Sequence, residues 1–250
     1  MTVPPMARLV VGLLLLWSAC GADDDTSIRV LAASSLTDAF EALAEAFAAT
    51  EAAGGMSVEL SFAGSATLAA QLEEGAPADV VATADEATMA RVVESGRAVA
   101  PPQLFATNEL TIAVHPSATA EVAELADLGD DEVLVALCAP QVPCGALSGE
   151  LLAAAGVEVD PATNEPNVRS VLTKVVLGEV DAGLVYRTDL AGAEPDDVVE
   201  RPTGVTDAPR NRYPIAALSD DAAAQAFVEF VRSPAGQTVL ASFGFEAARP

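Results

Sequence analysis

The stretch from residue 28 to residue 40, Ile-Arg-Val-Leu-Ala-Ala-Ser-Ser-Leu-Thr-Asp-Ala-Phe, places a short apolar strand directly before a helix. Residues 28–32 are almost continuously apolar, as in a buried parallel strand. The helix after them is predicted from apolar residues that recur with helical spacing, namely Leu36, Phe40, Leu43 and Phe47. Ser35 and Asp38 fit a capping box at its start. A strand that turns directly into a helix is the repeating unit of an α/β fold.

The same alternation of strand and helix continues along the chain. Further strands are predicted over residues 57–62, 79–82, 109–114, 133–137 and 182–186. Helical periodicity marks further helices around residues 68–72, 89–93, 147–152, 168–176, 220–232 and 234–243. We therefore predict an α/β fold with largely parallel sheets. Polar or proline-containing residues near 107–108 and 209–212 are the candidate boundaries between two lobes, and the last helices would return to the first lobe.

Composition and charge restrict the classes of function. The chain has 250 residues, of which 51% are hydrophobic, so it can bury a large core. Its 12 Lys and Arg stand against 37 Asp and Glu, and the formal net charge is −25. This acidity argues against nucleic acid as a partner, because phosphate contacts need clustered basic side chains. By the same reasoning it argues against any anionic ligand, and the motifs described below contradict that inference.

The N-terminus has the layout of an export signal. Arg8 precedes an apolar run over residues 9–17 that is too short to span a bilayer permanently. Ser18, Ala19 and Cys20 follow, and they resemble a bacterial lipoprotein cleavage box in which Cys20 becomes the lipidated first residue. Trp17 departs from that pattern, and an ordinary secretory signal is the alternative. We predict a signal peptide over residues 1–20 and a solvated tether over residues 21–27. The expected location is extracytoplasmic, either lipid-anchored at the outer face of the cell membrane or periplasmic.

Two cysteines remain after the leader, Cys138 and Cys144. A disulfide between them is expected in the oxidising environment outside the cytoplasm. Their C-x5-C spacing differs from the C-x-x-C of thiol oxidoreductases. Two cysteines and the single His115 make a poor metal site, so we predict no direct metal-cation ligands and no cofactor. His115 lies between an apolar strand and Pro116, and a loop position is predicted for it.

Four of the predicted helices share a similar beginning, in the segments 33–38, 63–68, 138–146 and 165–168. Small residues in them let a ligand approach the backbone closely, and the serines add hydroxyl donors. In the last segment, Asn167 is placed to cap a helix whose first turn begins at Val168. One serine before a helix usually acts only as a cap. Several helix N-termini that converge on one point would bind an anion without Lys or Arg, because each carries unpaired N–H donors and about half a positive charge.

Taken in order, these segments resemble the periplasmic molybdate-binding proteins of bacterial ABC transporters. The resemblance covers residues 28–245, and each of its motifs is short, so the signal lies in their order and spacing. The matching segments are residues 30–40, 61–68, 75–80, 84–85, 142–145, 167–169, 183–186, 213–215, 233–236 and 243–245.

The resemblance implies a two-lobed periplasmic-binding-protein fold with mostly parallel sheets and a two-strand hinge. The first lobe would comprise residues 28–107 and 212–250, and the second residues 108–211. The ligand would be molybdate, with tungstate as a second candidate. The residues that match the family's oxyanion contacts are Ser35, Ser65, Cys144, Val168 and Tyr186. Cys144 occupies a position that is often alanine, but its role is a backbone one, and a Cys138–Cys144 disulfide would hold its N–H towards the anion.

The resemblance also implies the partners: a permease with its ATPase, contacted by a monomeric, lipid-anchored binding protein. A receptor of the same fold for sulfate or phosphate remains an alternative. A ferric-ion receptor fits poorly, because Tyr186 and Tyr213 are the only tyrosines and are not adjacent. An exported enzyme is disfavoured, because no nucleophile-elbow motif is present and His115 is the only histidine. A sensing module would normally bring a DNA-binding or transmembrane helix, and neither is predicted.

Overall fold

The computed structural model describes residues 27–191, 193–194 and 196–248. The predicted signal peptide, Cys20 and residues 21–26 of the predicted tether lie outside these residues. Ser27, predicted as the end of the tether, is instead the first residue of a strand. Among the described residues, no helix combines the length and apolar character that crossing a membrane requires.

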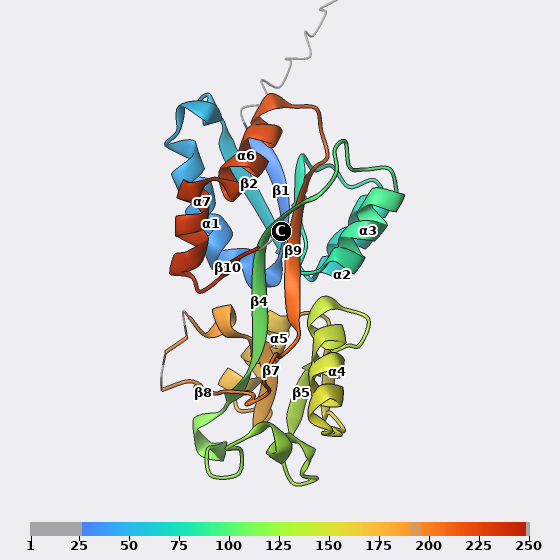
Figure 1. Cartoon of the computed structure of the whole chain (residues 1–250), viewed down its shortest axis with the longest axis vertical. Coiled ribbons are helices and arrows are strands. Elements are labelled where there is room, and N and C mark those ends of the chain that lie inside the picture. The colour runs from blue at the N-terminus through green and yellow to red at the C-terminus, as the bar shows by residue number, and fades with distance from the viewer. Residues whose placement is uncertain (1–26, 192, 195, 249–250) are drawn as a thin grey trace, which may run out of the picture.

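The strands form one continuous mixed sheet that runs along an elongated molecule (Figure 1). The strand order is β2-β1-β3-β9-β4-β7-β5-β6. At one end the three parallel strands are β1 (Ser27–Ala33), β2 (Ser57–Ala63) and β3 (Val80–Ala82). At the other end they are β5 (Val135–Cys138), β6 (Thr163–Glu165) and β7 (Ala182–Tyr186). The predicted α/β class is confirmed. The pairs within each of these two sets are parallel, as expected, although β6 was not among the predicted strands.

Two strands in the middle of the sheet connect these ends. They are β4 (Gln103–Val114) and β9 (Arg210–Ala217), which pair antiparallel with each other. From Leu110 onward β4 pairs with β7 instead. The predicted lobe boundaries therefore fall inside these two strands. Below, the first lobe means residues 27–106 and 213–248, and the second lobe means residues 110–208.

Helices cover both faces of the first lobe (Figure 1). One face carries α1 (Thr37–Ala48), α6 (Ala222–Arg232) and α7 (Pro234–Ser242). The other carries α2 (Ser65–Glu73) and α3 (Glu86–Glu94). Successive residues of β1 point to opposite faces of the sheet. Val30 therefore packs in the core beneath α1, and Leu31 packs in the core beneath α2. The predicted helical stripe of α1 is fully buried, as its periodicity requires.

The second lobe has a single core between its strands and two long helices, α4 (Pro143–Ala155) and α5 (Val168–Val176). Short elements complete the molecule: β8 (Val199–Arg201), β10 (Glu246–Ala247), and the 3-10 turns η1 (Ser34–Leu36), η2 (Glu51–Ala53), η3 (Pro116–Ala118), η4 (Leu125–Gly129) and η5 (Arg187–Leu190). His115 precedes η3, and its side chain accepts a hydrogen bond from the Ser117 N–H. Its predicted position in a loop is confirmed.

Gly145 lets the first turn of α4 pack against the end of β5. A Cβ there would lie 1.9 Å from the Ala139 carbonyl oxygen, whereas a Cβ at Gly149 on the same helix would meet nothing within 4 Å. We expect Gly145→Ala to lower the free energy of unfolding by about 2–3 kcal/mol through overpacking. Gly149→Ala should raise it by about 0.5–1 kcal/mol through helix propensity. Urea denaturation of both variants measures these changes, and equal effects would contradict the assigned packing.

Candidate anion-binding site

A small cavity lies between the two lobes. The five residues proposed from the sequence all line it: Ser35, Ser65, Cys144, Val168 and Tyr186. Its other lining residues are Ala33, Ser34, Gly64, Ala84, Val142, Pro143, Pro166 and Asn167. The four predicted helix starts, far apart in the sequence, thus meet around one space.

Residues at the start of each of these helical elements border the cavity. Ser35 lies in η1, the turn that leads into α1, and Ser65 is the first residue of α2. Cys144 is the second residue of α4, and Val168 is the first residue of α5. N–H groups in a first helical turn have no partner within the helix, and they concentrate positive potential there. The arrangement can therefore hold an anion with neutral groups alone.

The cap predicted for α5 is confirmed, whereas the capping box predicted for α1 is wrong. The Asn167 side chain accepts a hydrogen bond from the Ser170 N–H at 3.0 Å. In contrast, the N-cap of α1 is Leu36, with no side-chain cap bond. Ser35 is bound to the Tyr213 hydroxyl at 3.2 Å, and Asp38 is bound to Arg169. Both side chains therefore bind residues distant in the sequence instead of capping the helix.

The hydroxyl groups of Ser65 and Tyr186 are set up as donors. The Ser65 Oγ accepts from the Ala84 N–H at 3.0 Å, and the Tyr186 hydroxyl accepts from the Asn211 amide. A hydroxyl that already accepts keeps its own proton to donate. Burial, followed by the nearby charge of Tyr213, raises the pKa of Tyr186 well above its usual value. Tyr186 therefore keeps its proton at neutral pH.

A buried polar network on the connecting strands supports these hydroxyls, and the sequence reasoning missed it. Asn108 of β4 and Asn211 of β9 face each other in register. The Asn108 amide donates to Thr188 at 2.7 Å and to the Tyr213 hydroxyl at 3.5 Å, while its oxygen accepts from the Glu109 N–H at 3.0 Å. The stretch Arg-Asn-Arg-Tyr-Pro over residues 210–214 has no apolar periodicity that would mark Asn211 as buried.

Arg169 links three of the elements around the cavity. Its guanidinium pairs with Asp38 of the first lobe and lies 3.1 Å from the fully buried Asp189 of the second. The other carboxylate oxygen of Asp189 accepts from the Tyr186 N–H at 3.2 Å. Burial raises the pKa of Asp189 to about 7, against the opposing charge of Arg169. Neither Arg169 nor Asp189 was singled out from the sequence.

Cys138 and Cys144 form a disulfide, with their Cα atoms 5.7 Å apart. Cys138 ends β5 and Cys144 lies in the first turn of α4, so the bond ties the turn between them to the helix start. Both side chains are buried in the core of the second lobe. The bond therefore fixes the part of the backbone whose N–H groups border the cavity.

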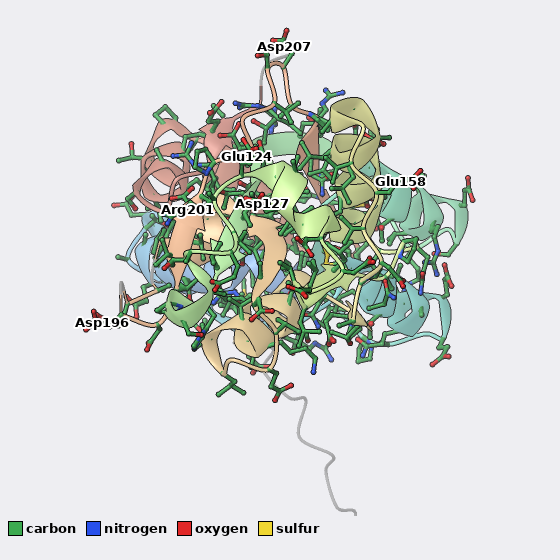
Figure 2. The ribbon with its side chains drawn as sticks, turned by 90° about the horizontal axis from the view of Figure 1, so that it is seen from below. Glu124, Asp127, Glu158, Asp196, Arg201 and Asp207 are labelled. Atoms are coloured by element: carbon green, nitrogen blue, oxygen red, sulfur yellow. A yellow bond between two sulfur atoms is a disulfide. The ribbon has the colours of Figure 1, made fainter. Side chains whose placement is uncertain are left out.

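Charge is distributed away from the cavity. None of the described residues that line it is charged. A larger hollow beside β4 is lined by Glu109 and Glu200 together with Arg187, and those carboxylates would repel an anion. At the far end of the second lobe, Figure 2 labels the exposed acidic side chains Glu124 and Glu158. Most acidic side chains of the described residues lie on the surface, and Glu165 and Asp189 are the buried exceptions.

A two-lobed α/β fold with connecting strands and a cavity between the lobes is the architecture of solute-binding proteins. The comparisons with known proteins agree. Residues 28–246 match the family model of bacterial extracellular solute-binding proteins, and the chain belongs to that family.

Individual relatives refine this placement. The chain is 38% identical over 256 residues to the molybdate-binding protein ModA of Mycobacterium tuberculosis, covering 96% of this chain and 94% of the relative. The periplasmic molybdate-binding protein of Azotobacter vinelandii has the same fold, with a TM-score of 0.75 at 20% identity, covering 89% of this chain and 100% of that one. The sulfate-binding protein SubI of Mycobacterium tuberculosis also shares the fold, with a TM-score of 0.73 at 21% identity and coverage of 90% and 88%. The resemblance predicted from the motifs is confirmed.

The disulfide should stabilise the second lobe. Closing so short a loop restricts the unfolded chain, and the expected contribution is about 2 kcal/mol. We expect the double variant Cys138→Ala, Cys144→Ala to lose about that amount in urea denaturation. Wild-type protein treated with a reductant should lose a similar amount, while the reductant should leave the double variant unchanged. Two free thiols in non-reducing mass spectrometry would contradict the bond.

Proposed function

We propose that this protein binds molybdate, and tungstate with it, in the cavity between its lobes. The observation that carries the proposal is a cavity between the lobes that is lined by helix N-termini and hydroxyl groups and, among the described residues, by no charged group. The molybdate-binding relative at 38% identity, which covers nearly the whole chain, supports this choice of ligand.

The residues proposed to contact the anion are those that the sequence motifs indicated. Ser35 and Ser65 would each donate through hydroxyl and backbone N–H, Cys144 and Val168 through backbone N–H, and Tyr186 through its hydroxyl. A hydrogen bond to a charged group contributes about 1.5–3 kcal/mol. Several such bonds together offset the roughly 4–15 kcal/mol that association costs in lost freedom.

The donor set also bears on which anions are rejected. A fully deprotonated dianion only accepts hydrogen bonds, so it suits a cavity that only donates. Protonated phosphate carries a P–OH that needs an acceptor, and no carboxylate is among the described lining residues. Sulfate is a dianion too, and its exclusion would rest on the size of the closed cavity, since it is smaller than molybdate.

The transport role follows from family membership. We propose that the protein acts outside the cytoplasm as a monomer, without catalysing a reaction, and delivers its anion to the permease of an ABC transporter. A lipid at Cys20 would hold it at the membrane surface. Mass spectrometry of protein isolated from membranes tests that anchor, and a mature chain that begins after Cys20 would exclude it.

Ligand identity is tested by titration calorimetry with molybdate, tungstate, sulfate and phosphate. We expect saturable binding of molybdate and tungstate, with much weaker or undetectable binding of sulfate and phosphate. Binding of sulfate or phosphate in preference to molybdate would assign the other oxyanion class to the same cavity. A protein that bound none of the four anions would refute the proposed function.

The proposed contacts are tested by removing single hydroxyl groups. Ser35→Ala and Tyr186→Phe should each weaken molybdate binding by about 1–3 kcal/mol, or about 5- to 150-fold in Kd, because each removes a donor to a buried charge. Ser242→Ala, an exposed change on α7, is the matched control and should leave the Kd unchanged. Unchanged affinity in both cavity variants would place the binding site elsewhere.

A further inference from the structure

Arg169 makes an ion pair that crosses from one lobe to the other beside the cavity. It is the second residue of α5 and follows Val168, whose N–H borders the cavity. Its partner Asp38 lies in the first turn of α1, three residues after Ser35. The pair therefore joins the two helix starts that face each other across the cavity.

The second lobe holds Arg169 in place on its own side. Asp189 has no exposed side-chain surface and lies 3.1 Å from the Arg169 Nε, while the Arg169 and Asp38 side chains are 33% and 46% exposed. Arg169 and Asp189 both belong to the second lobe, so their contact does not depend on closure of the lobes. The contact with Asp38 belongs to the other lobe, so it forms only when the lobes approach each other.

A backbone contact next to this pair shows how closely the lobes approach. A Cβ built on Gly64 of the first lobe would lie 2.6 Å from the carbonyl oxygen of Pro166 in the second lobe. Pro166 is three residues before Arg169 in the sequence. Any side chain at position 64 would therefore hold the lobes apart at the place where Arg169 reaches Asp38.

We propose that Arg169 is a positioning residue that latches the lobes closed over the bound anion through Asp38. Asp189 orients the Arg169 guanidinium, and Asp38 pairs with it when the lobes close. Gly64 allows the backbones of the two lobes to come close enough for Arg169 to reach Asp38. The latch rests on the proposed function for the identity of the anion. It goes beyond that function because none of these side chains contacts the anion. The latch instead lowers the rate at which the bound anion dissociates.

For the variant Asp38→Asn, the latch and simple electrostatics predict opposite effects on how tightly the anion is held. Removing a negative charge near an anion would by itself tighten binding. Loss of the latch instead speeds release of radiolabelled molybdate from the full-length protein, by about threefold to tenfold, with little change in the association rate. Asp38→Glu, which keeps the carboxylate, should release at close to the wild-type rate. Glu41→Gln removes the same charge from an exposed position on α1 and is the matched control.

A second variant removes closure without touching the charges. Gly64→Ala should speed release as well, because it holds the lobes apart. When it is combined with Asp38→Asn, the two effects should be less than additive, since both act on the same closed state. Full additivity, or release from Asp38→Asn that is as slow as or slower than from wild type, would overturn the latch.

The failures of the two proposals can be told apart. Wild-type protein that binds molybdate, with Asp38→Asn releasing it no faster, would leave the proposed function standing and refute the latch. Wild-type protein that binds none of the four anions would refute the function. The latch would then be judged by small-angle scattering, in which Asp38→Asn should have a larger radius of gyration than wild type and Glu41→Gln should not. Equal radii would refute it.

Discussion

The antiparallel pairing of β4 with β9 is the constraint on which the cavity depends. These two strands carry the chain between lobes that otherwise have separate hydrophobic cores. Near residue 109 the pairing of β4 passes from β9 to β7, so the same strand is built into both halves of the sheet. Asn108 and Asn211 face each other just before this point, and through Tyr213 and Tyr186 they reach the donors that line the cavity. The connection between the lobes and the support of the site are therefore one structure.

The net charge of −25 and an anion site are compatible because they act over different distances. Exposed charges are screened within about 8–10 Å at physiological ionic strength, whereas helix N-termini act at contact distance inside a space from which water is displaced. The described residues that line the cavity are uncharged. Most of the described acidic side chains stand on the outer surface, where they favour solubility. The inference from overall charge to ligand charge fails for this reason.

Local pattern predicted most of the elements, and it failed where a residue serves a distant partner. Most strands and helices of both lobes follow from apolar periodicity, although the polar strand β6 does not. The Asn167 cap forms as expected because its bond is local. The capping box of Ser35 and Asp38 does not form, because Tyr213 and Arg169 compete for those side chains. Strand β9 was missed because it contains Pro214 and buries polar Asn211 and Tyr213. Proline and asparagine both argue against a central strand.

The sequence by itself determined the alternation of strands and helices, the type of residue at each helix start, and a set of motifs whose order pointed to five cavity residues. These are local properties, because a few neighbouring residues decide periodicity, capping and turn chemistry. Only the tertiary structure decided that four helix starts meet at one cavity, that Asn108 and Asn211 orient its hydroxyls, and that Arg169 spans from Asp189 to Asp38. Those contacts join residues far apart along the chain. The pairing of β4 with β9 sets how far apart these residues lie in space.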